Sequence, residues 1–197
     1  SGDWSSDVCS SDLADQKEQV GVATGLAYTA FGGDTLPVEV TYYKGNGKLV
    51  LTGKLGDVMK ESAMTALSFV KAHAEALKLD ITLFDQNDFH IHVPEGAVPK
   101  DGPSAGITLA TAIYSALSQR FVNKEVGMTG EITLRGNVLP IGGLKEKAIA
   151  AHRSGLKTIL IPKDNEKDVD DIPKEVKNAL KIIPVDHVTD VFNKALK

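Results

Sequence analysis

Apolar and polar positions alternate through the first quarter of the chain, a spacing typical of half-buried β-strands. The turn-like sequence Phe31-Gly32-Gly33-Asp34 separates two such segments, so we expect residues 21–30 and 36–43 to pair as a hairpin. A second turn of the Asn-Gly type follows at Lys44-Gly45-Asn46-Gly47. Residues 48–52 are then expected to close a three-stranded β-meander.

After Gly56 the apolar residues recur at steps of three and four, which is the period of an amphipathic helix. Asp57 is the expected N-cap, and the apolar stripe consists of Met59, Ala63, Ala66, Leu67, Val70, Ala74 and Leu77. The pattern then predicts strands at 88–93, 126–134, 137–141, 157–161 and 181–185, and helices at 104–119, 142–154 and 188–196. Residues 164–180 are charged and weakly helical. This order predicts an α+β fold in which a β-meander precedes mixed β/α units.

The first thirteen residues do not fit this pattern, because they have neither a strand nor a helix period. They also lack the basic and apolar regions of a signal peptide. The stretch resembles the in-frame translation of a common sequencing-adapter oligonucleotide. We therefore expect residues 1–13 to be a disordered gene-assembly artefact and one domain to span 14–197, truncated upstream near Ala14.

Composition narrows the class of protein. With 42% hydrophobic and 24% charged residues the chain is in the globular range, and it contains no run of 18 apolar residues. A net charge of −4 argues against a nucleic-acid-binding domain, which would need a clustered basic face. Cys9 is the single cysteine, which excludes an intrachain disulfide and fits a reducing compartment.

The candidate chemistry centres on Ser104, in the stretch Pro99-Lys100-Asp101-Gly102-Pro103-Ser104-Ala105-Gly106. A serine at a helix N-terminus lies near free N–H donors and a positive dipole end, which can also stabilise an oxyanion. It becomes a nucleophile only when a base takes its proton. The other interpretation is that Ser104 merely caps the helix.

The sequence contains several candidate bases for this serine. The match of 102–106 to G-x-S-x-G is weak, because that motif needs a strand running into the turn and a downstream histidine of a larger fold. Ser68 and Lys71 match S-x-x-K by chance inside the amphipathic helix. Lys145 and Lys147 flank the apolar stripe of a later helix, and burial would make either one a base. Periodicity leaves the choice between them open.

Four segments together resemble the proteolytic domain of bacterial Lon, an ATP-dependent serine protease: 93–96, 99–106, 128–136 and 139–147. Thr24–Thr29 and Gly32–Asp34 resemble the start of that domain. The resemblance covers about residues 15–197. It implies a Lon-type fold and a serine endopeptidase with a Ser-Lys dyad, in which Ser104 is the nucleophile and Lys147 the general base.

The same resemblance implies further roles. Thr129 would hydrogen-bond the dyad lysine, Asp101 would shape active and inactive states of the serine loop, and substrate would contact Tyr28, Glu95 and Gly96. Tyr28 stands where many relatives have Trp. His90 and His92 match histidines on the strand that leads to the loop. Their alternation places them on one face, but no third ligand stands at metal spacing, so we expect no metal.

The sequence contains no G-x-x-x-x-G-K-[ST] motif, so we expect no cofactor in this chain, and ATP and Mg²⁺ only in an upstream AAA+ module. The family further implies unfolded-protein substrates, a homo-hexamer and a cytoplasmic location, with no membrane partner. The rival hypothesis is a non-catalytic Lon-like assembly or binding domain. Such a domain would be expected to lose Ser104 or Lys147, and this chain keeps both.

Overall fold

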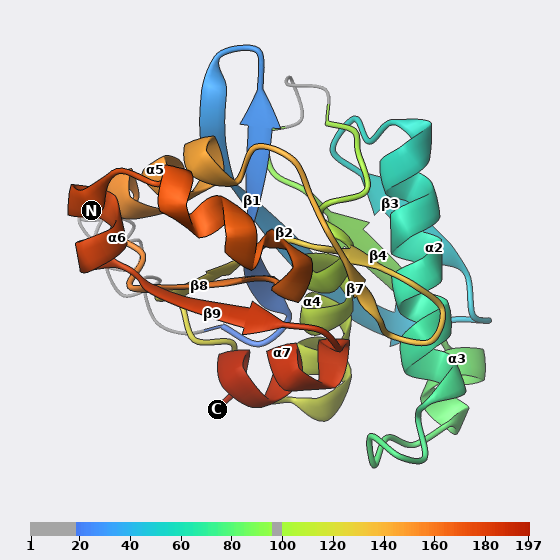
Figure 1. The fold of residues 1–197 in the computed structure, drawn as a ribbon. Helices are drawn as coiled ribbons and strands as arrows, with labels where there is room; N and C mark the ends of the chain where they lie inside the picture. The colour runs from blue at the N-terminus through green and yellow to red at the C-terminus, as the bar shows by residue number, and fades with distance from the viewer. Residues whose placement is uncertain (1–18, 96–99) are drawn as a thin grey trace, which may run out of the picture.

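The computed structural model describes residues 19–95 and 100–197. A mixed seven-stranded sheet in the order β3-β4-β2-β1-β5-β8-β9 forms its centre (Figure 1). Its strands are β1 Val22–Thr29, β2 Gly32–Lys44, β3 Leu49–Thr52, β4 Asn87–His92, β5 Val126–Met128, β8 Thr158–Pro162 and β9 Lys181–Val185. A small antiparallel ribbon joins β6 Glu131–Ile132 to β7 Val138–Leu139. The predicted fold class, a mixture of strands and helices, is confirmed.

Helices cover the two faces of the sheet. They are α2 Asp57–Ala72, α3 Thr82–Gln86, α4 Gly106–Ser118, α5 Leu144–Arg153, α6 Lys174–Ala179 and α7 Val188–Ala195, with a 3₁₀ helix η1 at Lys163–Asp171. In the view of Figure 1, α5 and α6 lie at one side of the molecule and α2 at the other. Among the described residues, none of these helices has the length and apolar character needed to cross a membrane.

The alternation along β8 shows that there are two separate cores. Leu160 belongs to the larger core, which includes residues of α2, α4 and α7. Its neighbours Ile159 and Ile161 point to the opposite face and join the smaller core with residues of α5 and α6. The sheet therefore separates the helix that follows Ser104 from the helix that carries Lys147.

The predicted hairpin of the first two strands is confirmed, because all of β1 pairs antiparallel with the first part of β2, Gly32 to Glu39. The predicted meander is wrong in its third strand. β4 lies between β2 and β3, antiparallel to the first and parallel to the second. The turn between β2 and β3 bonds to the start of β4 rather than to itself, since the N–H groups of Asn46 and Lys48 donate to the Asp88 carboxylate.

Most other elements lie within a few residues of their predicted bounds. The exceptions are α3, which was not predicted, and 126–141, where three short strands replace two longer ones. The expected artefact at 1–13 and the candidate residue Gly96 lie outside the described residues.

Candidate active site

A cavity of about 540 Å³ opens beside the C-terminal end of β1. Three segments form most of its lining: the end of the β1–β2 hairpin, the serine loop around 100–104, and the segment from Pro140 to Gly143 just before α5. Ser104 and Lys147 both line this cavity, so the fold brings the two candidates together from 43 positions apart in the sequence.

Ser104 is not a helix cap. Helix α4 begins at Gly106, and its N-cap residue is Ala105, with no capping bond from a side chain. Ser104 lies one residue earlier, in a turn closed by the Gly106 N–H, which donates to the Pro103 carbonyl at 3.2 Å. The capping interpretation of this serine is therefore wrong, and Ser104 instead lines the cavity.

The structure separates the two candidate lysines. Lys145 is exposed, whereas Lys147 is only 2% exposed. Burial lowers the pKa of the Lys147 amine from its usual 10.5 to about 8, because the charged form loses its hydration. At neutral pH about a tenth of the amine is then uncharged and able to accept a proton.

Two consecutive residues after β5 connect the serine to the lysine. The Lys147 Nζ donates to the buried Thr129 Oγ1 at 3.1 Å. The next residue, Gly130, donates its N–H to the Ser104 carbonyl at 2.8 Å and accepts from the Ile107 N–H at 3.0 Å. Thr129-Gly130 thus holds the lysine through a side chain and the serine turn through the backbone.

Gly106 makes this close approach possible. A Cβ on Gly106 would lie 2.7 Å from the backbone nitrogen of Ile132, inside any normal contact distance. The glycine after Ser104 therefore lets the start of α4 pack against the segment that follows β5. Among the described residues, however, no hydrogen bond joins Ser104 Oγ to Lys147 Nζ.

Asp101 fastens the serine loop to helix α2. Its carboxylate accepts from the Met59 N–H at 3.0 Å and from the Gly102 N–H at 2.9 Å. These donors, with a further contribution from Val58, lower the pKa of the Asp101 carboxyl. The predicted N-cap Asp57 is instead the first helical residue, after Gly56, which has no side chain. Asp101 supplies the missing cap from 42 residues away.

The remaining predicted residues fall into two groups. Tyr28, which is 57% exposed, and Glu95 both line the cavity. His90 and His92 share one face, as predicted, and both bond to Thr52 Oγ1, at 2.8 and 2.6 Å. Neither histidine is among the described residues that line the cavity. Within the described ranges, no group of three or more potential ligands is placed to hold a metal ion.

Two features of the site were missed by the sequence reasoning. The segment 140–143 lines the cavity, although the motif there drew attention only to its lysines. Asn165, in the segment expected to be weakly helical, is 2% exposed and bonds to the backbone of Ile141. No local pattern in the sequence marks Asn165, which stands among charged neighbours and bonds to a residue 24 positions earlier.

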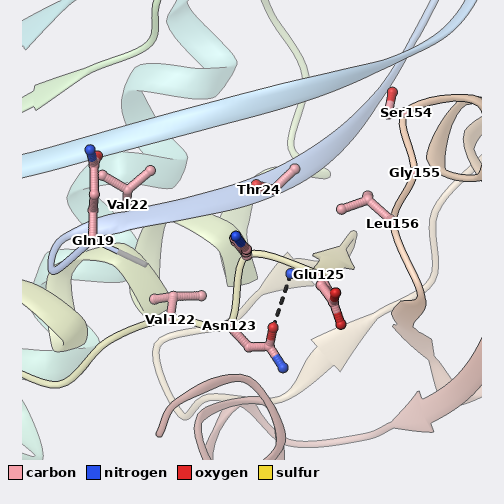
Figure 2. Close-up of a pocket in the computed structure, with 10 residues that line it drawn as sticks. Gln19, Val22, Thr24, Val122, Asn123, Glu125, Ser154, Gly155 and Leu156 are labelled. Atoms are coloured by element: carbon pink, nitrogen blue, oxygen red, sulfur yellow. Dashed lines mark hydrogen bonds between the residues drawn. The ribbon is translucent and has the colours of Figure 1, made fainter. Parts of the chain in front are cut away.

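A second cavity of about 470 Å³ lies at the opposite end of the sheet. It is lined by Val22 and Thr24 of β1 and by the residues that precede β5 and β8 (Figure 2). There the Glu125 N–H donates to Asn123 Oδ1 at 3.0 Å. This cavity contains none of the candidate residues from the sequence analysis.

Comparison with known proteins adds to this geometry. The sequence model of the family described as the Lon protease (S16) C-terminal proteolytic domain matches residues 5–197.

Individual relatives agree with that match. The chain is 66% identical to the Lon protease of Aster yellows witches'-broom phytoplasma over 182 residues, which is 92% of this chain and 23% of the relative. It is 64% identical to the Lon protease of Mycoplasma mycoides subsp. mycoides SC (93% and 23% covered). It is 62% identical to Lon protease 1 of Bacillus subtilis (93% and 24% covered). The chain thus spans about a quarter of the length of these relatives.

Proposed function

The chain belongs to the family of Lon protease C-terminal proteolytic domains, and we propose that it hydrolyses peptide bonds with Ser104 as the nucleophile and Lys147 as the general base. One observation carries this assignment. Lys147 is a buried amine with a pKa of about 8, it lines the same cavity as Ser104, and adjacent residues hold both.

The reaction is an acyl transfer through a covalent intermediate. The neutral Nζ of Lys147 accepts the Ser104 hydroxyl proton, and Oγ attacks the peptide carbonyl carbon. The resulting Lys147 ammonium then donates this proton to the leaving amine, and the C–N bond breaks. A water molecule next loses a proton to Lys147, and its oxygen attacks the acyl carbon. The bond between this carbon and Ser104 Oγ breaks, which releases the acid, and the Lys147 ammonium returns the proton to Oγ. The hydrogen bond between a nucleophile and its base, here Ser104 Oγ and Lys147 Nζ, is often long in the free enzyme and shortens when substrate binds.

The turn at Ser104 also offers donors for the oxyanion. The Gly106 and Ile107 N–H groups are occupied by Pro103 and Gly130. Among the described residues, no hydrogen-bond acceptor is present for the N–H groups of Ser104 and Ala105. In the proposed reaction these two amides would donate to the substrate carbonyl oxygen, where the negative charge develops.

Substrate would bind as an extra strand on β1. On one side β1 pairs with β2 along its whole length, but on the other it pairs with β5 only at Thr24 and Gly25. The following residues, Ala27 to Thr29, line the cavity. An extended peptide can therefore pair with this edge and pass Ser104, with Tyr28 and Glu95 at its sides.

The activity of the whole protein is also a proposal. We propose that an upstream AAA+ module, which would bind ATP and Mg²⁺, delivers unfolded proteins to this domain in a cytoplasmic homo-hexamer. Within the present chain, His90 and His92 would act indirectly, by holding Thr52 at the end of β3.

The decisive experiment is labelling with a fluorophosphonate, which reacts with activated serines. We expect the wild-type chain to be labelled at Ser104 and to cleave unfolded casein, and Ser104→Ala and Lys147→Ala to lose both properties. Casein cleavage that persists in Lys147→Ala would refute the assignment of the base. A wild-type hexamer that is neither labelled nor active would favour the rival binding module.

A further inference from the structure

The amide of Asn165 pairs with the backbone of a residue in the cavity wall as a neighbouring β-strand would. Asn165 Oδ1 accepts from the Ile141 N–H at 2.9 Å, and Asn165 Nδ2 donates to the Ile141 carbonyl at 2.9 Å. Asp168 Oδ2 accepts the second Nδ2 hydrogen at 2.8 Å, which fixes the orientation of the amide. With Asn165 only 2% exposed, these bonds form away from competing water.

Ile141 needs this support because of its place in the chain. Strand β7 ends at Leu139, and helix α5 begins at Leu144. The segment between them contains Gly142 and Gly143, and Gly143 adopts a φ of +71° as the N-cap of α5. Two consecutive glycines are conformationally permissive, so local sequence alone would leave this wall loosely defined.

Ile141 is part of the candidate active site. Pro140, Ile141, Gly142 and Gly143 line the cavity together with Ser104 and Lys147. Asn165 occupies the Ile141 N–H and one lone pair of the Ile141 carbonyl, so we expect this residue to meet a peptide mainly through its apolar side chain. The same side chain packs against the smaller core, so its position is defined on two sides.

We propose that Asn165, oriented by Asp168, is a positioning residue that fixes the Ile141 wall of the peptide-binding cavity. This inference rests on the proposed function. It means that a residue of η1, outside the cavity, affects the affinity of the cavity for a peptide. Asn165 acts through Ile141, and among the described residues no hydrogen bond joins it to Lys147. Its loss should therefore weaken substrate binding without changing the chemistry at Ser104.

The test compares Asn165→Asp with a matched Asn123→Asp variant in the full chain. A carboxylate at 165 cannot donate to the Ile141 carbonyl and would lie next to the Asp168 carboxylate. Asn123 lines the second cavity at the far end of the sheet, and a carboxylate there can still accept from Glu125 N–H (Figure 2). For Asn165→Asp we expect KM for a fluorogenic peptide to rise about tenfold with kcat within about twofold. For Asn123→Asp we expect no change in either constant.

Asp168 provides a graded version of the same test. In Asp168→Asn an amide oxygen can still accept from Asn165 Nδ2, so we expect KM to stay within about twofold. In Asp168→Ala no acceptor remains, and we expect an increase in KM of several-fold. Equal KM values for the wild type and Asp168→Ala would indicate that Asn165 is oriented without its neighbour.

Two measurements separate a failure of this inference from a failure of the proposed function. The rate of Ser104 labelling by a small fluorophosphonate, which does not reach along the wall, should be unchanged in Asn165→Asp. In a Ser104→Ala background, where peptide binds without turnover, Asn165→Asp should raise the peptide Kd about tenfold by fluorescence anisotropy. An unchanged Kd, or a fall in kcat and labelling at constant KM, would overturn the positioning role. Peptide cleavage by Ser104→Ala itself would instead overturn the proposed function.

Discussion

At Lys147 the burial that makes the amine a base also makes the fold less stable. Below pH 8 the amine is charged in both the folded and the unfolded chain, and the folded chain bears the full cost of the buried charge. Between pH 8 and 10.5 the folded chain has lost this proton while the unfolded chain keeps it, so stability rises with pH. A shift of this size corresponds to about 3 kcal/mol.

Replacing this amine by an apolar side chain of similar length should therefore stabilise the protein. We expect Lys147→Met to raise the free energy of unfolding at pH 7 by up to about 3 kcal/mol. The gain over the wild type should shrink as the pH rises from 8 towards 10.5. Urea unfolding at several pH values measures it, and a difference that does not depend on pH would contradict the lowered pKa.

The same pKa predicts how activity depends on pH. Since only neutral Lys147 can act as the base, kcat/KM should fall about tenfold for each pH unit below 8 and level off above it.

In Thr129→Val the ammonium loses its acceptor, Thr129 Oγ1, which disfavours the charged form. We expect the midpoint of the profile to move to lower pH in this variant and the plateau to fall. Thr129→Ser, which keeps the acceptor, is the control.

At the scale of elements, the serine loop is coupled to the start of α2. The Gly56 N–H donates to the Lys100 carbonyl at 2.7 Å, and Asp101 caps the helix at Met59. A helix that takes its cap from another segment loses stability whenever that segment moves. The arrangement of the loop before Ser104 and the order of the first turn of α2 should therefore change together.

Asp101 substitutions test this coupling. We expect Asp101→Ala to lower Tm by a few degrees and to reduce fluorophosphonate labelling of Ser104 at least several-fold, because both the cap and the loop anchor are lost. Asp101→Asn keeps an oxygen that accepts the same bonds, so Tm and labelling should stay close to wild type at neutral pH. The Asp101 carboxylate stabilises the fold fully above its unfolded pKa, and this stabilisation is lost as the pH falls through the lowered pKa of the folded protein. Only the wild type should therefore lose stability in this acidic range, because Asp101→Asn has no carboxylate to protonate. Wild-type labelling by Asp101→Ala would disprove the coupling.

Elements could be predicted from the sequence where a short stretch of residues carries their pattern. The β1–β2 hairpin follows from polar and apolar alternation, and helix α2 follows from its helical period. The partner of β3 does not, because the chain returns through α2 and α3 to insert β4 between neighbours in sequence. The cap at Asp101 was missed for the same reason, since its partner lies 42 residues away.

For the candidate site, sequence patterns and structure contributed different parts. The motif around Ser104 and the pair Lys145 and Lys147 were visible in the sequence, but helical period could not say which lysine is buried. That choice depends on which face of α5 meets the sheet. The resemblance to the Lon family selects Lys147, and Lys147 is the buried lysine of the two. Asn165 has no local pattern at all, because its role consists of bonds to Ile141, 24 residues earlier.

At the scale of the whole molecule, the two candidate catalytic residues come from opposite sides of the sheet. Ser104 precedes α4, in the larger core, and Lys147 lies on α5, whose buried residues form the smaller core. Their meeting point is the end of β5, where Thr129-Gly130 contacts both. The geometry of the dyad therefore depends on how the α5 layer sits on the hairpin β1–β2.

Gly33 is the position where the packing of α5 on the β1–β2 hairpin can be tested. It lies at the start of β2, and a Cβ there would collide with the backbone carbonyl of Glu146, the residue before Lys147. Backbone atoms cannot rotate away, so Gly33→Ala must push α5 and the hairpin apart. We expect the free energy of unfolding to fall by about 1–3 kcal/mol and labelling of Ser104 to fall at least tenfold, even at temperatures where the variant is fully folded.

Gly142→Ala is the matched substitution for the stability measurement. A Cβ on Gly142 meets no atom within 4 Å, so Tm should stay close to that of the wild type. A folded Gly33→Ala protein with wild-type labelling would show that the position of Lys147 does not depend on the contact between hairpin and helix. Loss of labelling in the folded variant would instead mean that the packing of α5 on the hairpin sets the distance across which the proton must move.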